Sequence, residues 1–263
     1  MTTSAGSRPP TTPEILRIKL TLAYDGAPFA GWQIQPNADT VQARLEEALA
    51  EVAKTPLRLH ASGRTDTGVH ALGQVAHFDA PDQLTMNPHN WVPALNTKLP
   101  AAIRILSAEE VAPDFHARFH AKRKTYRYRL NTLPILPPFL ANRAWHLPRL
   151  LNPEDLAQAL SFYVGEHDFR AFAANRGNET PDTNYVRTIS NASFIHLDDG
   201  LELIFTGNGF LYKMVRLLTG AAIQAAQGYL RQDDLYNLVH HPQDTKSPLT
   251  APAAGLTLHE VRY

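Results

Sequence analysis

The chain contains no cysteine among its 263 residues. This absence excludes disulfide bonds, a thiolate nucleophile and cysteine-ligated zinc, and it agrees with a reducing compartment, so we expect a cytoplasmic protein. The sequence also lacks any run of about 18 apolar residues, the length that would predict a transmembrane helix. Residues 1–13 are rich in Ser, Thr and Pro and have no apolar signal-peptide core. They therefore predict a disordered N-terminal tail.

Net charge is absent as well, because 25 Lys and Arg balance 25 Asp and Glu. A neutral chain does not at first suggest nucleic acid binding, but the charges are unevenly placed. No acidic residue occurs between Phe115 and Pro153. The same stretch carries these basic residues: Arg118, Lys122, Arg123, Lys124, Arg127, Arg129, Arg143 and Arg149. This basic stretch predicts either a phosphate-binding face or a solvated strand edge.

Hydrophobic spacing predicts a mixture of strands and helices. Asp198-Asp199-Gly200 between two alternating runs indicates a hairpin, and Thr40 and Asn152 are suited to begin helices as N-caps. Strands are expected over residues 16–22, 57–60, 74–78, 103–106, 124–130, 186–196, 201–206 and 256–262, and helices over 41–52, 153–165, 211–226 and 233–239. This mixture predicts an α+β fold rather than a doubly wound parallel sheet.

The segment from Gly63 to Val75, GRTDTGVHALGQV, sets one carboxylate, Asp66, between an arginine and a glycine-rich turn. The three glycines permit unusual backbone angles and a close approach by another backbone or a ligand. Such a carboxylate can serve as a nucleophile. It can equally be a turn former whose oxygens bind its own backbone, and the residue types alone leave both interpretations open.

Taken with its surroundings, this segment resembles the catalytic segment of the TruA family of tRNA pseudouridine synthases, through GRTDTGVHALGQVAHFD at residues 63–79. Other blocks similar to the family follow in family order from about residue 15 to the C-terminus. They are Tyr24-Asp25-Gly26 with Phe29 and Gly31-Trp32-Gln33, Thr40-Val41-Gln42 with Leu45-Glu46, Asp114 to Phe119, Tyr126-Arg127-Tyr128, His167-Asp168-Phe169, Gly207 to Leu211 with Met214-Val215-Arg216, and Gly255-Leu256.

The resemblance implies an enzyme that isomerises uridine to pseudouridine at positions 38, 39 and 40 of the tRNA anticodon stem-loop. It implies two related α+β halves, residues 14–111 and 112–263, whose mixed or antiparallel sheets join around a central cleft. It further implies a homodimer with tRNA as its partner. The reaction exchanges an N1–C1′ bond for a C5–C1′ bond and needs no redox agent, metal or nucleotide energy, so no cofactor is expected.

The resemblance also assigns the site residues. Asp66 is the nucleophile, Arg216 its cationic partner, and Tyr126 an aromatic face for the extruded uracil. Arg64 is expected to contact the RNA, and Leu256 to pack against the bound base. The residue types alone leave plainer roles open, namely a solvated helix arginine for Arg216, a core tyrosine for Tyr126 and a core leucine for Leu256. Tyr128 is expected in the core.

Two other functions are compatible with these residues. A non-catalytic tRNA-binding or tRNA-folding protein would use the same basic stretch, but it has no need of an anionic carboxylate facing phosphate. A carboxylate-based glycosidase would need a second catalytic acid, and none is evident beside Asp66. His116 and His120 have helical metal-ligand spacing, but they lie in the basic stretch, so RNA contact or packing is favoured over metal. Thr67 stands where the family usually has alanine.

Overall fold

The computed structural model describes residues 16–81, 84, 86–177, 179–243 and 245–263, so the tail predicted at residues 1–13 lies outside the described residues. Ten strands form a single sheet with the order β4-β1-β3-β10-β5-β9-β8-β7, to which β2 is added beside β3 and β6 beside β5. The pairs are antiparallel except β10 with β3 and β5 with β6. This mostly antiparallel mixed sheet with separate helices confirms the predicted α+β class.

The first part of the chain forms one end of this sheet. Its elements are β1 (Leu16–Tyr24), α1 (Val41–Ala53), β2 (His60–Ala61), β3 (His70–Ala80), α2 (Trp91–Asn96) and β4 (Ile103–Val111), with a 3-10 turn at Pro88–Asn90. The alternation predicted for β1 is observed, since Ile18, Leu20 and Leu22 are fully buried. Helix α1 begins after Thr40, whose hydroxyl accepts the N–H of Ala43, as the N-cap pattern predicted.

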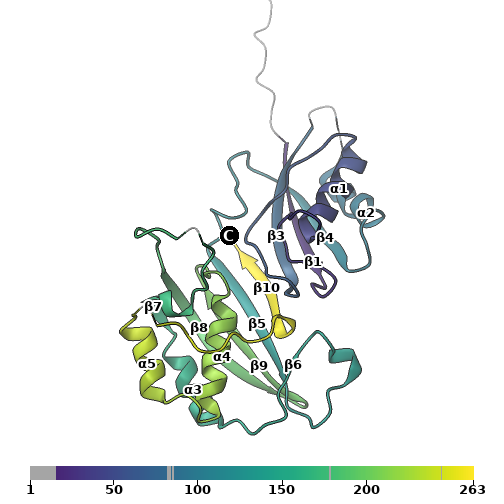
Figure 1. Ribbon diagram of the computed structural model, residues 1–263. Helices are drawn as coiled ribbons and strands as arrows, with labels where there is room; N and C mark the ends of the chain where they lie inside the picture. Colours follow the sequence, from purple (N-terminus) through teal and green to yellow (C-terminus); the bar gives the residue numbers. More distant parts are fainter. Residues whose placement is uncertain (1–15, 82–83, 85, 178, 244) are drawn as a thin grey trace, which may run out of the picture.

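The rest of the chain forms the other end. Its elements are β5 (Arg123–Asn131), β6 (Trp145–His146), α3 (Pro153–Ser161), β7 (Gly165–Asp168), β8 (Val186–Leu197), β9 (Gly200–Gly207), α4 (Met214–Ala226), α5 (Gln232–His240) and β10 (Leu256–Arg262), with 3-10 turns at Pro138–Leu140, Arg170–Phe172 and Ala253–Gly255. Figure 1 shows the helices in two groups, α1 and α2 beside β1, β3 and β4, and α3 to α5 over β5, β8 and β9. The predicted β8–β9 hairpin is confirmed.

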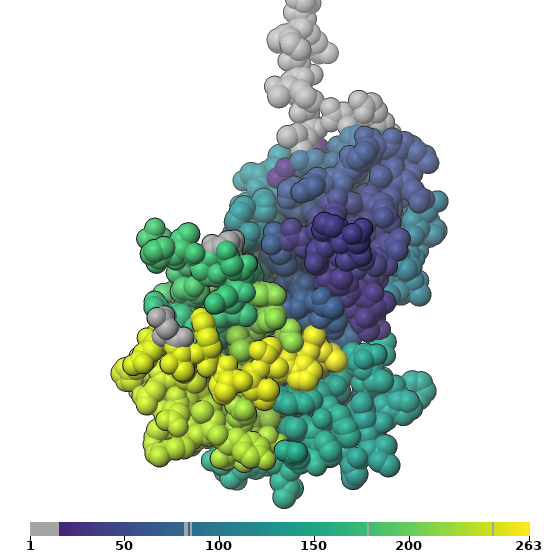
Figure 2. Space-filling model, in the orientation of Figure 1, coloured from purple at the N-terminus to yellow at the C-terminus, as the bar shows by residue number. Residues whose placement is uncertain are grey.

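The C-terminal strand β10 joins the two ends of the sheet. Thr257 pairs with His70 of β3 in parallel, while Leu256 pairs with Tyr128 of β5 in antiparallel register. In Figure 2 the yellow C-terminal residues accordingly run across the visible face toward the blue N-terminal part. Only one strand therefore separates β3, which follows the Asp66 turn, from β5, which carries Tyr126. The boundary expected near residue 111 stays a prediction.

Two predicted elements have different bounds in the structure. The strand expected over residues 57–60 is the two-residue β2, His60–Ala61. The helix expected from residue 211 begins at Met214, because Lys213 adopts a left-handed backbone conformation with φ of 58° that cannot lie inside an α-helix. The seven residues before α4 thus form a loop over the end of β9. Among the described residues, no helix has the length and apolar character needed to cross a membrane.

Candidate active site

Asp66 lies in the loop between β2 and β3, and a tight backbone contact shapes this loop. Trp32 donates its N–H to the carbonyl of Thr65 at 3.0 Å, and Val69 donates to the carbonyl of Asp66 at 3.1 Å. Gly31 has φ of +92°, and a Cβ there would lie 2.8 Å from the Thr65 oxygen. The close packing of these two loops therefore requires glycine at position 31.

A buried polar network supports the loop from below. The hydroxyl groups of Tyr24 and Thr65 are hydrogen-bonded at 2.8 Å. Gln74 donates to the carbonyl of Gly63 at 3.0 Å and accepts from the Ser62 hydroxyl at 2.7 Å. Because Ser62 and Gln74 are fully buried and each bond is made within the protein, the loop backbone is held in one conformation.

Arg216, in the first turn of α4, forms an ion pair with Asp66. Its Nη1 donates to Asp66 Oδ2 at 3.0 Å, and its Nε donates to the carbonyl of Ala251 at 2.8 Å. The two side chains are 14% and 19% exposed, respectively, so the pair is largely shielded from water. Within the described part of the chain, Oδ1 of Asp66 makes no hydrogen bond. One carboxylate oxygen is thus anchored and the other is left for a substrate.

Tyr126 of β5 lies in the same neighbourhood. Its ring contacts Phe210 edge to face, with 5.2 Å between centroids. Burial raises the pKa of the Tyr126 hydroxyl above its usual value, and nearby Tyr24 and the charge of Asp66 raise it further. This hydroxyl therefore stays protonated at neutral pH. Tyr128 is fully buried and donates to the carbonyl of Pro252 at 2.7 Å, which confirms the core role predicted for it.

Leu256 and Arg64 occupy the border of this region. Leu256 is 5% exposed and begins β10, directly after the Ala253–Gly255 turn. That turn meets the Asp66 loop, because a Cβ on Gly68 would lie 3.4 Å from the side chain of Ala253. Arg64 is exposed beside Asp66. Partial burial, followed by the charges of Arg176 and Arg118, lowers its pKa, so three cations from separate segments gather here.

The structure divides the basic stretch instead of presenting one charged face. Arg127 and Arg129 pair with Glu202 and Asp199 at 2.9 and 2.7 Å. Arg143 pairs with Asp25. Other cations remain toward the Asp66 loop, since the charge of Arg118 contributes to lowered pKa values of Arg64, Lys124 and Arg187. A phosphate-binding face thus draws on part of the stretch together with arginines outside it.

The histidines bond the backbone, as was expected of His70 and His77. His70 accepts the N–H of Gly26 at 3.0 Å, and His77 accepts that of Ala117 at 3.2 Å. His116 and His120 are linked by a weak bond of 3.4 Å between a backbone N–H and a ring nitrogen. In the part of the chain that the structure describes, no group of three or more potential ligands is placed to hold a metal ion.

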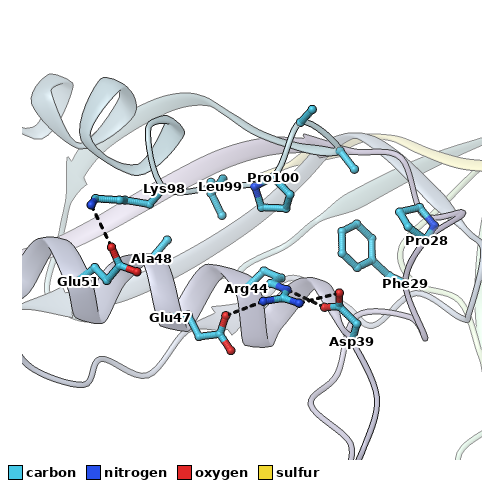
Figure 3. Close-up of a pocket in the computed structure, with 12 residues that line it drawn as sticks. Pro28, Phe29, Asp39, Arg44, Glu47, Ala48, Glu51, Lys98, Leu99 and Pro100 are labelled. Carbon is cyan, nitrogen blue, oxygen red and sulfur yellow. Dashed lines mark hydrogen bonds and ion pairs between the residues drawn. The ribbon is translucent and has the colours of Figure 1, made fainter.

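A surface hollow of about 620 Å³ lies elsewhere, between α1 and the segment before β4 (Figure 3). Its charged walls are paired with one another: Arg44 with Asp39 and Glu47, and Lys98 with Glu51. None of the residues predicted for the site lines it. The hollow is therefore separate from the Asp66 site.

The sequence analysis missed three residues that hold this site together. Tyr24 and Gln74 occur in the motifs quoted above, but the motifs do not reveal that both lie beneath the Asp66 loop. Lys124 was counted only as one positive charge of the basic stretch, although it donates to the carbonyl of Ser62 at 2.6 Å. Its period-two spacing from Tyr126, on the same face of β5, is the signal that could have identified it.

Comparison with known proteins supports the resemblance. Residues 21–120 and 159–263 match the family model described as tRNA pseudouridine synthase. A protein of Akkermansia muciniphila called tRNA pseudouridine synthase A is 51% identical over 94% of this chain and 95% of its own length. Proteins of the same name from Geobacillus sp. and Limosilactobacillus fermentum are each 43% identical over 94% of this chain and 98% and 96% of their own lengths. The chain therefore belongs to the tRNA pseudouridine synthase family.

Proposed function

We propose that this protein is an isomerase that converts uridine to pseudouridine at positions 38, 39 and 40 in the anticodon stem-loop of tRNA, with Asp66 as the nucleophile. The observation that carries the proposal is the shielded ion pair between Asp66 and Arg216, which leaves one carboxylate oxygen without a protein partner among the described residues. Its relatives are tRNA pseudouridine synthases of nearly the same length.

The ion pair gives Asp66 the properties of a nucleophile. Removing a carboxylate from water favours its neutral form, and a guanidinium at hydrogen-bonding distance favours the anion. Arg216 is itself held by the Ala251 carbonyl, so its position does not depend on Asp66 alone. The carboxylate attacks the uridine while the N1–C1′ bond is broken, as glycoside-processing carboxylates do when they form covalent sugar intermediates.

Tyr126 supplies a surface for the base. The new C5–C1′ bond expels the C5 proton, and N1 gains a proton, so the reaction is balanced without a cofactor. With its raised pKa, the Tyr126 hydroxyl is a poor acceptor for the C5 proton at neutral pH. Its role is therefore to stack on the extruded uracil. Leu256 packs against the base from β10.

Binding of the anticodon stem-loop relies on the cations around Asp66. Arg64 and Arg118 are exposed, and RNA phosphates would relieve the mutual repulsion that lowers the pKa of Arg64. The homodimer implied by the family resemblance stays a prediction, which sedimentation equilibrium of the purified protein would test.

Pseudouridine mapping tests the proposal. Unmodified tRNA transcripts are incubated with the protein and no added cofactor, labelled with carbodiimide and read by primer extension. We expect stops at uridines 38 to 40 with the wild type and none with Asp66→Asn. Asp199→Asn is a matched control, since Asp199 pairs with Arg129 far along β9, and it should retain every stop.

The same experiment separates the alternative of a non-catalytic tRNA-binding protein. A protein that binds tRNA tightly but produces no stops on any transcript would have that function, and the Asp66 loop would then be structural. Stops that persist in Asp66→Asn would instead remove Asp66 from the role of nucleophile.

A further inference from the structure

Lys124 differs from the other cations of the basic stretch because its ammonium group points into the protein. Its side chain is half-buried, whereas Lys122 and Arg123 just before it are exposed. Residues 124 and 126 of β5 project from the same face of the strand, so Lys124 emerges beside Tyr126. Its Nζ donates a hydrogen bond to the carbonyl oxygen of Ser62 at 2.6 Å.

Ser62 begins the loop that carries Asp66. We propose that Lys124 is a positioning residue for the isomerisation, which fixes the start of the Ser62–Asp66 loop by binding the Ser62 carbonyl. This inference rests on the proposed function of Asp66. It assigns to Lys124 a role in the reaction instead of a general attraction for RNA.

The loop is anchored at both ends by cations from beyond β10. Lys124 holds Ser62, and Arg216 holds Asp66 at 3.0 Å. Between them, Gln74 of β3 binds the carbonyl of Gly63. Four residues of chain thus connect two charge-assisted contacts, which are stronger than neutral hydrogen bonds. A carboxylate on so short a tether changes its position when either anchor is lost.

The local packing is built around the ammonium group. A Cβ on Gly63 would lie 3.0 Å from Lys124 Nζ, so the absence of a side chain at position 63 makes room for it. The residues paired with Lys124 across the sheet, Gly207 and Val261, carry no charge. The carbonyl of Ser62 is thus a partner that Lys124 cannot exchange for a nearby carboxylate of its own sheet neighbours.

The proposal has a pH signature. Burial, followed by the charge of Arg118, lowers the pKa of Lys124 from 10.5 to about 8. Ser62, Gly63, Gly207 and Val261, which face Lys124 from the loop and the neighbouring strands, do not titrate. Above this pH the amine becomes neutral and the bond to Ser62 loses its charge-assisted character. Bound RNA phosphate shifts the transition upward, so kcat should fall in an alkaline limb at or above about pH 8.

The test compares Lys124→Met and Lys124→Arg with a matched control, Lys122→Met, which makes the same change at an exposed neighbour. The rate is the release of tritium from tRNA labelled at uracil C5, measured over a range of tRNA concentrations and pH. We expect Lys124→Met to lower kcat by about ten- to a hundredfold, the effect of losing one charge-assisted hydrogen bond. KM should stay within about threefold, and Lys122→Met should keep the wild-type kcat. Lys124→Arg should recover part of kcat and lack the alkaline limb, because a guanidinium stays protonated.

Two results would overturn the proposal. The first is a wild-type kcat in Lys124→Met, or a loss confined to KM that Lys122→Met reproduces, which would make Lys124 a simple phosphate contact. The second decides the question even if Lys124→Met does not fold: an alkaline limb in Lys124→Arg that coincides with that of the wild type. Failure of the proposed function would look different, because Asp66→Asn would then keep the wild-type rate whatever the Lys124 variants do.

Discussion

Replacing Arg216 by methionine removes the cationic partner of Asp66 while keeping an unbranched side chain in the first turn of α4. The lost contact is one charge-assisted hydrogen bond of 3.0 Å between side chains that are 14% and 19% exposed. Such a bond contributes about 1.5–3 kcal/mol. At about 1.4 kcal/mol for each factor of ten, the rate of pseudouridine formation should fall about 10- to 150-fold.

Arg17→Met is the matched control for this variant. Arg17 also pairs with an aspartate, Asp79, and with a backbone carbonyl, that of Phe115, but its partners lie on β3 and in the segment after β4. Single-turnover tritium release from C5-labelled tRNA at saturating enzyme gives the rate, and urea unfolding gives the stability. Each variant should lose about 1–2 kcal/mol of stability, while only Arg216→Met should lose the rate. A rate within threefold of the wild type in Arg216→Met would refute the role given to the ion pair.

Gly31→Ala should destabilise the protein by about 2–4 kcal/mol in urea unfolding, because it combines a left-handed backbone with a Cβ that lies 2.8 Å from the Thr65 oxygen; Gly228→Ala, with φ of +74° but open space, should cost about 1 kcal/mol, and equal losses would contradict this account. Burial, followed by His116 and Arg17, lowers the pKa of His77 to about 4, so the unfolded chain binds more protons below pH 6.5. Stability should therefore fall as the pH drops from about 6.5 to 4, by at most about 3 kcal/mol, and His77→Gln should flatten this slope in urea titrations.

The local elements were predictable from the sequence because their signals are local. Thr40 and Asn152 each begin a helix with a side-chain bond to the backbone of its first turn. The alternation of residues 16–22 gives β1 its buried face. The place of β10 between β3 and β5 was not predictable, since nothing in residues 256–262 specifies which strands they pair with.

The site was predictable only in part, and for a similar reason. The ion pair between Asp66 and Arg216 joins residues 150 positions apart, and it was anticipated through the family resemblance rather than from spacing. The basic stretch was treated as one surface, yet Arg127 and Arg129 point to acidic partners on β9 and its turn. Lys124 turns to the loop instead. Charge counts cannot separate such residues, because the direction of each side chain depends on its strand neighbours.

The central claim is that Asp66 is the nucleophile of a uridine isomerisation. Single-turnover tritium release from C5-labelled tRNA by Asp66→Asn tests it most directly, with tRNA binding measured on the same preparation. We predict that tRNA affinity stays within about threefold of the wild type while tritium release falls to background, because the amide is isosteric but neither anionic nor nucleophilic. Tritium release at the wild-type rate from Asp66→Asn would contradict the account.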